Sequence, residues 1–242
     1  MHTLLLRLAG PMQSWGTQSR FSIRDTGMEP SKSGVIGLVC AALGRDRAEP
    51  VDDLAALRMG VRVDREGVMM RDFHTALDVV KASGRRPPRP KHPEFTVTSH
   101  RYYLADADFL VGLEGEDLDL LTEIHRALAS PRWPLCLGRK SFVPSLPPYI
   151  PDGLKRDTNL KNALISHPWP SILASAERGN AGRRPSERPQ RLRFVLETPF
   201  GQGEETRFDQ PEGRCFRDRT FGLRYVTTSF EPLGARIPIR ED

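Results

Sequence analysis

Two short segments combine a small residue, a hydroxyl group and positive charge in a way that suits phosphate binding. Ser31-Lys32-Ser33-Gly34 precedes an apolar run, so free backbone N–H groups, a hydroxyl and an ammonium would meet at the positive end of a helix. Gly138-Arg139-Lys140-Ser141 places two cations and a hydroxyl after a turn residue. A simple helix cap explains the first segment equally well. Neither is a nucleotide-hydrolysing loop, because Gly-x-x-x-x-Gly-Lys-Ser is absent.

A third cationic segment, 81–93, carries five Lys or Arg, four prolines and no acid. A proline-stiffened arm of this kind can hold several positive groups along a polyphosphate. The alternative is a solvated loop without function. Single cations at Arg20 and Arg24 add to the first interpretation, in which the arm would contact nucleic acid or a neighbouring subunit through four residues: Arg85, Arg86, Arg89 and Lys91.

Aromatic and titratable residues suggest two further roles. Trp15, close to Gln13 and followed by Gly16, could stack on an unpaired base, although a Trp that closes the core is the alternative. A metal-free ribonuclease needs a general base, an acid and a cation for the phosphorane charge. The residues that could supply them are Asp72, His74, Tyr102, Tyr103 and Lys140, and a structural histidine is the alternative for His74.

Composition limits the remaining possibilities. The 242 residues carry 36 Lys or Arg against 31 Asp or Glu, a net charge of +5, and 38% are hydrophobic. A membrane span needs about 20 apolar residues and no run approaches this, so we expect a cytoplasmic protein without a membrane partner. The three cysteines are far apart and the six histidines are scattered. We therefore expect no disulfide, no metal site and no cofactor.

The elements that must position these residues follow from hydrophobic periodicity and turn signals. The order of strand, helix, strands, helix and strand predicts an α+β fold with a ferredoxin-like βαββαβ unit, similar to an RNA-recognition motif, and a β-rich C-terminal part. Gly44 is expected to end the first helix, and 65–67 to form a hairpin turn. The pattern predicts strands at 3–9, 61–64, 68–71, 102–105, 109–113, 192–197 and 223–230, and helices at 34–43 and 116–129.

Five blocks of sequence closely resemble the CasD family of Cascade subunits in type I-E CRISPR systems, and their order and spacing match as well. They are residues 4–16, 30–38, 71–75, 101–109 and 137–141. The resemblance implies a ferredoxin-like domain of the RAMP superfamily over residues 1–150, with a thumb-like insertion at about 76–99. Residues 151–242 match mainly in general pattern and length and would form the β-rich part.

The resemblance also implies a function. Family members cap one end of the complex and grip the 5′ handle of the CRISPR RNA, and a separate nuclease cuts the precursor. The chain would then be no enzyme, and its partners would be CRISPR RNA, the backbone RAMP subunit, the large subunit and target DNA near the guide 5′ end. One handle pocket would contain Lys32, Ser33, Arg139 and Lys140, with Gln13 and Trp15 nearby. The other expected RNA-binding residues are Arg20, Arg24, Gly34 and Ser141. The alternatives are a metal-independent endoribonuclease that uses His74, Tyr103 and Lys140, and a general RNA-binding module.

Overall fold

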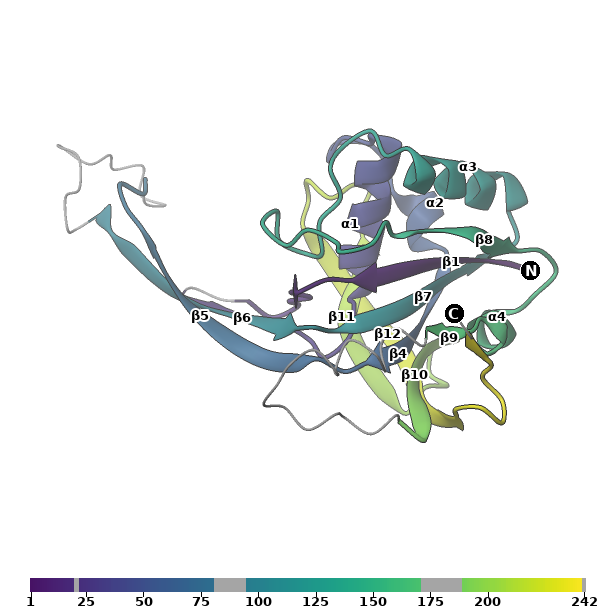
Figure 1. Cartoon of the computed structure of the whole chain (residues 1–242). Coiled ribbons are helices and arrows are strands. Elements are labelled where there is room, and N and C mark those ends of the chain that lie inside the picture. The colour runs from purple at the N-terminus through teal and green to yellow at the C-terminus, as the bar shows by residue number, and fades with distance from the viewer. Residues whose placement is uncertain (20–21, 81–94, 171–188, 241–242) are drawn as a thin grey trace.

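The computed structural model describes residues 1–19, 22–80, 95–170 and 189–240. Its main element is a seven-stranded antiparallel sheet in the order β11-β12-β10-β4-β7-β1-β8. Figure 1 shows α1 and α3 on one face of this sheet and α4 on the other. The strands are β1 (His2–Ala9), β4 (Arg58–Arg65), β7 (Asp108–Gly115), β8 (Tyr149–Lys155), β10 (Arg191–Thr198), β11 (Glu205–Glu212) and β12 (Thr220–Pro232).

Four helices are described, and two of them were predicted. Helix α1 begins at Lys32, two residues before the prediction, and ends at Gly44, whose φ of 77° is the left-handed conformation expected of a C-terminal glycine. Helix α3 is capped by Asp117, which accepts a hydrogen bond from the backbone of Leu120. The helices are α1 (Lys32–Leu43), α2 (Asp52–Ala55), α3 (Leu118–Ala129) and α4 (Leu160–Ser166).

Two hydrophobic cores lie on opposite faces of the sheet. Because side chains alternate along a strand, Leu4, Leu6 and Leu8 of β1 pack under α1 and α3, whereas Leu5 packs with Leu164 of α4. Burial on both faces explains why β1 is an almost continuous apolar run.

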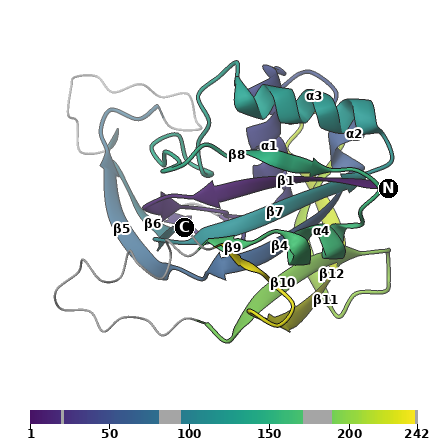
Figure 2. The same cartoon turned by 45° about the vertical axis from the view of Figure 1, so that its right-hand side comes forward.

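A hairpin projects from the body and bears a smaller sheet, as Figures 1 and 2 show. It consists of β5 (Val68–Ala76) and β6 (Val97–Ala105), joined at its base by β2 (Met12–Gln13) and β3 (Ile23–Arg24). We call the β5–β6 hairpin the thumb. Its pairing begins at Val68 opposite Ala105, so it starts before the expected insertion at about 76–99, of which residues 81–94 lie outside the described part of the chain.

The predicted hairpin between strands 61–64 and 68–71 is wrong. Strand β4 pairs with β7 and β10 in the central sheet, whereas β5 pairs with β6. Met59, Val61 and Val63 are buried, whereas Val68 and Met69 are exposed, so the two strands belong to different environments.

The main sheet continues across residue 150, where we expected the ferredoxin-like domain to end and the β-rich C-terminal part to begin. Strands β10, β11 and β12 extend the sheet that contains β1, and β8 spans residue 150. A short parallel pair, β9 (Trp169–Pro170) and β13 (Ile239–Arg240), completes the described strands. Among the described residues, no helix is long and apolar enough to cross a membrane.

Candidate nucleic-acid interface

The loop after β1 and the loop that carries Arg139 are packed together at the base of the thumb. The backbone N–H of Ser14 donates to the carbonyl of Leu137 over 3.1 Å. Gly138 adopts a φ of 87°, and a Cβ there would overlap the carbonyl of Ser14. Only glycine fits this close approach. The contact between Gly138 and Ser14 therefore fixes the position of the Arg139 backbone.

Arg139 lies against groups that orient it without neutralising it. Its Nη2 donates to the carbonyl of Tyr102 over 2.9 Å and to that of Arg24 over 3.3 Å. The guanidinium lies 5.4 Å from the centre of the Phe142 ring. Because backbone dipoles and an aromatic ring carry no net charge, Arg139 retains its positive charge for a ligand.

Two further arginines converge on the same place. Arg24 of β3 is opposite Arg101 of β6 in the parallel register, so their side chains share a face. Arg101 donates through Nε to the hydroxyl of Ser99 over 3.1 Å. We call Arg24, Arg101 and Arg139 the arginine cluster.

The electrostatics of the arginine cluster indicate excess positive charge. Burial, and then the neighbouring Arg101, lower the pKa of Arg139, with Asp25 and Asp72 opposing the shift. None of the three guanidinium groups forms an ion pair with any described residue. An anion that entered this place would relieve the repulsion, and the exposed Lys140 and Ser141 lie beside it in the chain.

The predicted phosphate site at the start of α1 is occupied by the chain itself, which corrects our expectation for Lys32. The backbone N–H of Lys32 donates to Asp209 Oδ2 over 2.7 Å, and Arg224 holds that carboxylate over 2.6 and 3.0 Å. The Lys32 ammonium pairs with Glu197 over 2.9 Å and its side chain is 1% exposed. Burial lowers the pKa of Lys32, and Glu197 opposes that shift.

Gln13 and Trp15 are also interior residues, so the expected stacking platform is corrected. Gln13 donates to the carbonyls of Leu8 and Ala107 over 2.9 and 2.8 Å and accepts from Trp15 Nε1 over 3.1 Å. Trp15 is 1% exposed. A Cβ on Gly34 would lie 2.9 Å from the indole, so this glycine serves helix packing. Ser33 is partly buried on the same turn.

The ribonuclease candidates do not converge. His74 is opposite Ser99, which lies four residues from Tyr103 along β6. At about 3.3 Å per residue, His74 and Tyr103 are separated by roughly 13 Å along the strand. The Tyr103 ring packs against Phe142 at 5.9 Å. The described residues contain no group of three metal-ligating side chains.

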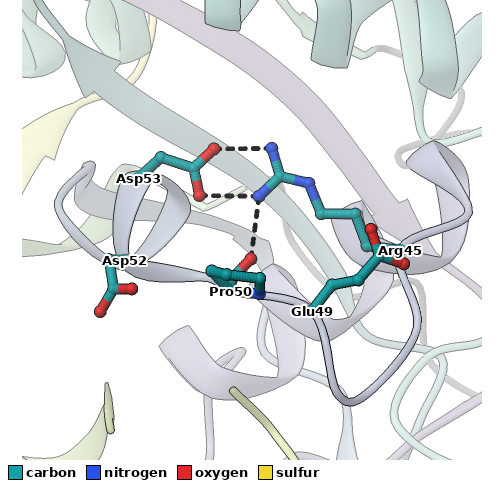
Figure 3. Close-up of a pocket in the computed structure, with 5 residues that line it drawn as sticks. All are labelled: Arg45, Glu49, Pro50, Asp52 and Asp53. Atoms are coloured by element: carbon teal, nitrogen blue, oxygen red, sulfur yellow. Dashed lines mark hydrogen bonds and ion pairs between the residues drawn. The ribbon is translucent and has the colours of Figure 1, made fainter. Parts of the chain in front are cut away.

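Figure 3 shows the residues that line a pocket beyond the end of α1. Arg45 forms two hydrogen bonds to Asp53 over 2.7 and 2.6 Å, and one to the carbonyl of Pro50. Asp53 therefore raises the pKa of Arg45. Glu49 and Asp52 complete the lining, and this surplus of carboxylates repels phosphate.

Five predicted contacts lie outside the described residues: Arg20, Arg85, Arg86, Arg89 and Lys91. Conversely, the sequence pattern did not single out Arg101, which the structure places beside Arg24 and Arg139. The alternation of Ser99, Arg101 and Tyr103 on one face of a strand is the signal that could have identified it.

Comparisons with known proteins agree with one another. A model of the family described as CRISPR-associated protein (Cas_Cas5) matches residues 3–227. The CRISPR system Cascade subunit CasD of Escherichia coli (strain K12) is 33% identical over 177 residues, covering 68% of this chain and 76% of that protein.

Two solved structures are similar along nearly the whole chain. One, described as the crystal structure of a Cas protein, is 47% identical, with a TM-score of 0.72 and coverage of 98% of both chains. The other belongs to a CRISPR RNA-guided surveillance complex and is 33% identical. It also has a TM-score of 0.72, with coverage of 98% of this chain and 95% of the other.

Proposed function

Because the chain belongs to the Cas5 family of CRISPR-associated proteins, we propose that it is a noncatalytic subunit of a CRISPR surveillance complex that binds the 5′ handle of the CRISPR RNA. The similar chain from an RNA-guided surveillance complex supports this assignment over almost the full length. The observation that carries the RNA-binding role is the arginine cluster: Arg139 contacts the backbone carbonyl of Arg24, Arg24 pairs in the register with Arg101, and none of the three side chains forms an ion pair with a described residue.

In this proposal the arginine cluster binds handle phosphates. Hydrogen bonds to charged groups contribute about 1.5 to 3 kcal/mol each. Lys140 and Ser141, which are exposed in the adjoining loop, supply further donors. Gly138 and Phe142 keep Arg139 in place before RNA arrives, so little side-chain entropy is lost on binding. Phosphate contacts position the strand and leave base recognition to other groups.

The thumb carries the proposed contacts with neighbouring subunits. Val68 and Met70 are exposed on one face, and Met69 and Phe73 on the other. Apolar side chains on both faces of a projecting hairpin suit an element that lies between partners, here the backbone and large subunits. The cations of segment 81–93 would then act on subunits or on target DNA near the guide 5′ end. Neutralising them should spare handle binding by the isolated chain and impair assembly.

The order of elements supports a ferredoxin-like unit within the sheet. Strands β8-β1-β7-β4 are adjacent, α1 follows β1, and α3 follows β7. This corresponds to a βαββαβ unit with the thumb inserted between its second and third strands, and β10 to β12 extend the β4 edge.

The test uses the purified chain with labelled RNA in EDTA. Filter binding should show retention of the 5′ handle, and repeat RNA should remain intact. Co-purification with the other subunits and the CRISPR RNA should distinguish a complex subunit from a general RNA-binding module. The proposal fails if a defined handle is cut from repeat RNA and His74→Ala abolishes the cleavage, or if the handle is not bound.

A further inference from the structure

The thumb is joined to the main sheet by two short connections, residues 66–67 and 106–107, which lie between the last strand pair of the main sheet and the first pair of the thumb. Each connection contains one residue in the left-handed conformation, Gly67 with a φ of 74° and Asp106 with a φ of 56°. A Cβ on Gly67 would lie 2.8 Å from the Cβ of Ala107, so the connections are in contact. Figure 1 shows β5 and β6 projecting from the body beyond them. The direction of the thumb therefore depends on these four residues.

Hydrogen bonds hold each connection in place. The backbone N–H of Asp106 donates to the carbonyl of Pro11 over 3.2 Å. The carboxylate of Glu66 accepts two hydrogen bonds from Arg193 of β10, over 2.8 Å from Nε and 2.7 Å from Nη2. A paired contact between a guanidinium and a carboxylate fixes orientation as well as distance. We call the contact between Arg193 and Glu66 the latch.

The body holds Arg193 in a fixed position. Its Nη1 donates to Glu29 over 3.0 Å, and Glu29 also accepts from Arg207 Nε of β11 over 2.9 Å. The side chains of Arg193 and Glu29 are 15% and 10% exposed, whereas that of Glu66 is 51% exposed. Hydrogen bonding to Glu66 raises the pKa of Arg193, although burial opposes this shift. Arg193 is thus a charged anchor of the body that reaches the exposed connection of the thumb.

The direction of the thumb matters because the arginine cluster is divided between the thumb and the body. Arg24 and Arg101 lie in the smaller sheet that contains the thumb. Arg139 lies in a loop whose residues Leu137 and Phe142 are buried in the core under α1 and α3. A change in the direction of the thumb therefore alters the spacing between Arg101 and Arg139. A strand binds most tightly when the groups that contact it are already held at the required spacing.

We propose that Arg193 is a positioning residue for RNA binding, because through Glu66 it sets the direction of the thumb and with it the geometry of the arginine cluster. That the RNA is the CRISPR RNA handle rests on the proposed function. Neither member of the latch contacts the RNA. By charge alone, deleting the anion at Glu66 would strengthen RNA binding. Loss of the latch weakens it, so the sign of the effect separates positioning from electrostatics.

The test compares Glu66→Ala with Glu66→Gln in the full chain. Both variants lose the same charge, but the amide oxygen of Gln can still accept a hydrogen bond from Arg193. Titration with labelled handle RNA should show about three- to fivefold weaker binding for Glu66→Ala and nearly wild-type binding for Glu66→Gln. The slope of log K against log salt should become shallower by about 0.7 in Glu66→Ala as one phosphate contact is lost. The control, Glu205→Ala, removes a half-exposed carboxylate that pairs with Arg207 and should not weaken binding.

A second measurement follows the direction of the thumb without RNA. Spin labels are attached through non-natural residues at Thr75 of the thumb and Arg156 of the body, which are both exposed, because the chain has free cysteines of its own. The distribution of distances between the labels should be broader in Glu66→Ala than in the wild type, and close to the wild type in Glu66→Gln.

Three results would overturn the positioning proposal. They are wild-type or tighter handle binding by Glu66→Ala, equal affinities of Glu66→Ala and Glu66→Gln, and a distance distribution that Glu66→Ala leaves unchanged. Failure of the wild-type chain to bind handle RNA would instead contradict the proposed function. The distance distributions would still test whether the latch sets the direction of the thumb.

Discussion

Positive side chains gather both at the start of α1 and at the base of the thumb, but they are ion-paired within the chain only at α1. At α1, Lys32 and Arg224 are buried with Glu197 and Asp209, so each charge has a partner within the chain. At the thumb, Arg139 contacts carbonyls and a ring. The difference shows that a cation stays available to an external anion when the fold orients it without supplying a carboxylate in contact with it. Its sequence motif does not decide this.

The largest expected effect is a loss of folding stability when the ion-pair network at the start of α1 is broken. Asp209→Ala removes the carboxylate that receives both Arg224 and the backbone of Lys32, and leaves a buried charge without its partner. Breaking a buried pair in this way costs about 3 to 5 kcal/mol. Urea unfolding should show this loss, whereas Glu212→Ala on the same strand should change little. A loss below about 1 kcal/mol would mean that the network at α1 is not structural.

The next effect concerns affinity. Arg101→Ala with Arg139→Ala removes two charge-assisted phosphate contacts, so handle RNA should bind more than tenfold more weakly. The free energy of unfolding should change by only about 1 kcal/mol, because the lost hydrogen bonds are partly exposed. The control is Arg217→Ala. The Arg217 side chain is 71% exposed and lies in the turn between β11 and β12. Equal losses of affinity in the control and the double variant would point to diffuse charge instead of a site.

A smaller effect on handle affinity tests whether the loop held by Asp25 must position Arg24 for binding. Asp25 accepts hydrogen bonds from the backbone of Thr17 and Gln18 over 3.3 and 2.9 Å and from the hydroxyl of Ser19, closing the loop before β3. Burial raises the pKa of Asp25, but these hydrogen bonds outweigh it and hold that pKa below its usual value.

Asp25→Ala should therefore weaken handle binding several-fold by freeing this loop, although it deletes a negative charge near the arginines. Asp72→Ala, which deletes the other carboxylate near Arg139, is the control and should strengthen binding slightly. Titration with labelled handle RNA measures both. Tighter binding by both variants would show that only charge matters.

A change of pH distinguishes the stability of the body from RNA binding at the arginine cluster. Burial, and then Arg62, lower the pKa of His167 from 6.5 to about 4. The unfolded chain takes up this proton near pH 6.5, so stability is highest above that pH and falls as the pH drops toward 4. Unfolding midpoints should follow this trend, less so in His167→Gln. Handle affinity should stay flat over pH 5 to 8, since arginine remains charged. A parallel fall in affinity would implicate a titrating group in RNA binding.

Local signals in the sequence predicted local structure well. The periodicity of 116–129 and the glycine at 44 predicted α3 and the end of α1, because each depends on neighbours within a few residues. The burial of Lys32 could not be predicted in this way. Its partners, Glu197 and Asp209, come from strands 165 and 177 residues further along the chain.

The candidate site was predicted in part for the same reason. The Gly-Arg-Lys-Ser segment was identified from its own residue types, and the structure brings it beside the loop after β1. Arg101 was not singled out because its position beside Arg24 depends on the register of β6 with β3, which is a pairing of distant segments. Trp15 resembled a stacking platform in sequence, and only tertiary packing against Gly34 distinguishes it from one.

The salt dependence of handle binding tests the central claim most directly. Each phosphate contact to a single strand contributes a slope of about −0.7 in log K against log salt. Replacing Arg24, Arg101 and Arg139 together by Gln should therefore reduce the slope by about 2, whereas Lys32→Gln should leave the slope of the folded protein at the wild-type value. A reduced slope in Lys32→Gln together with an unchanged slope in the triple variant would contradict the account.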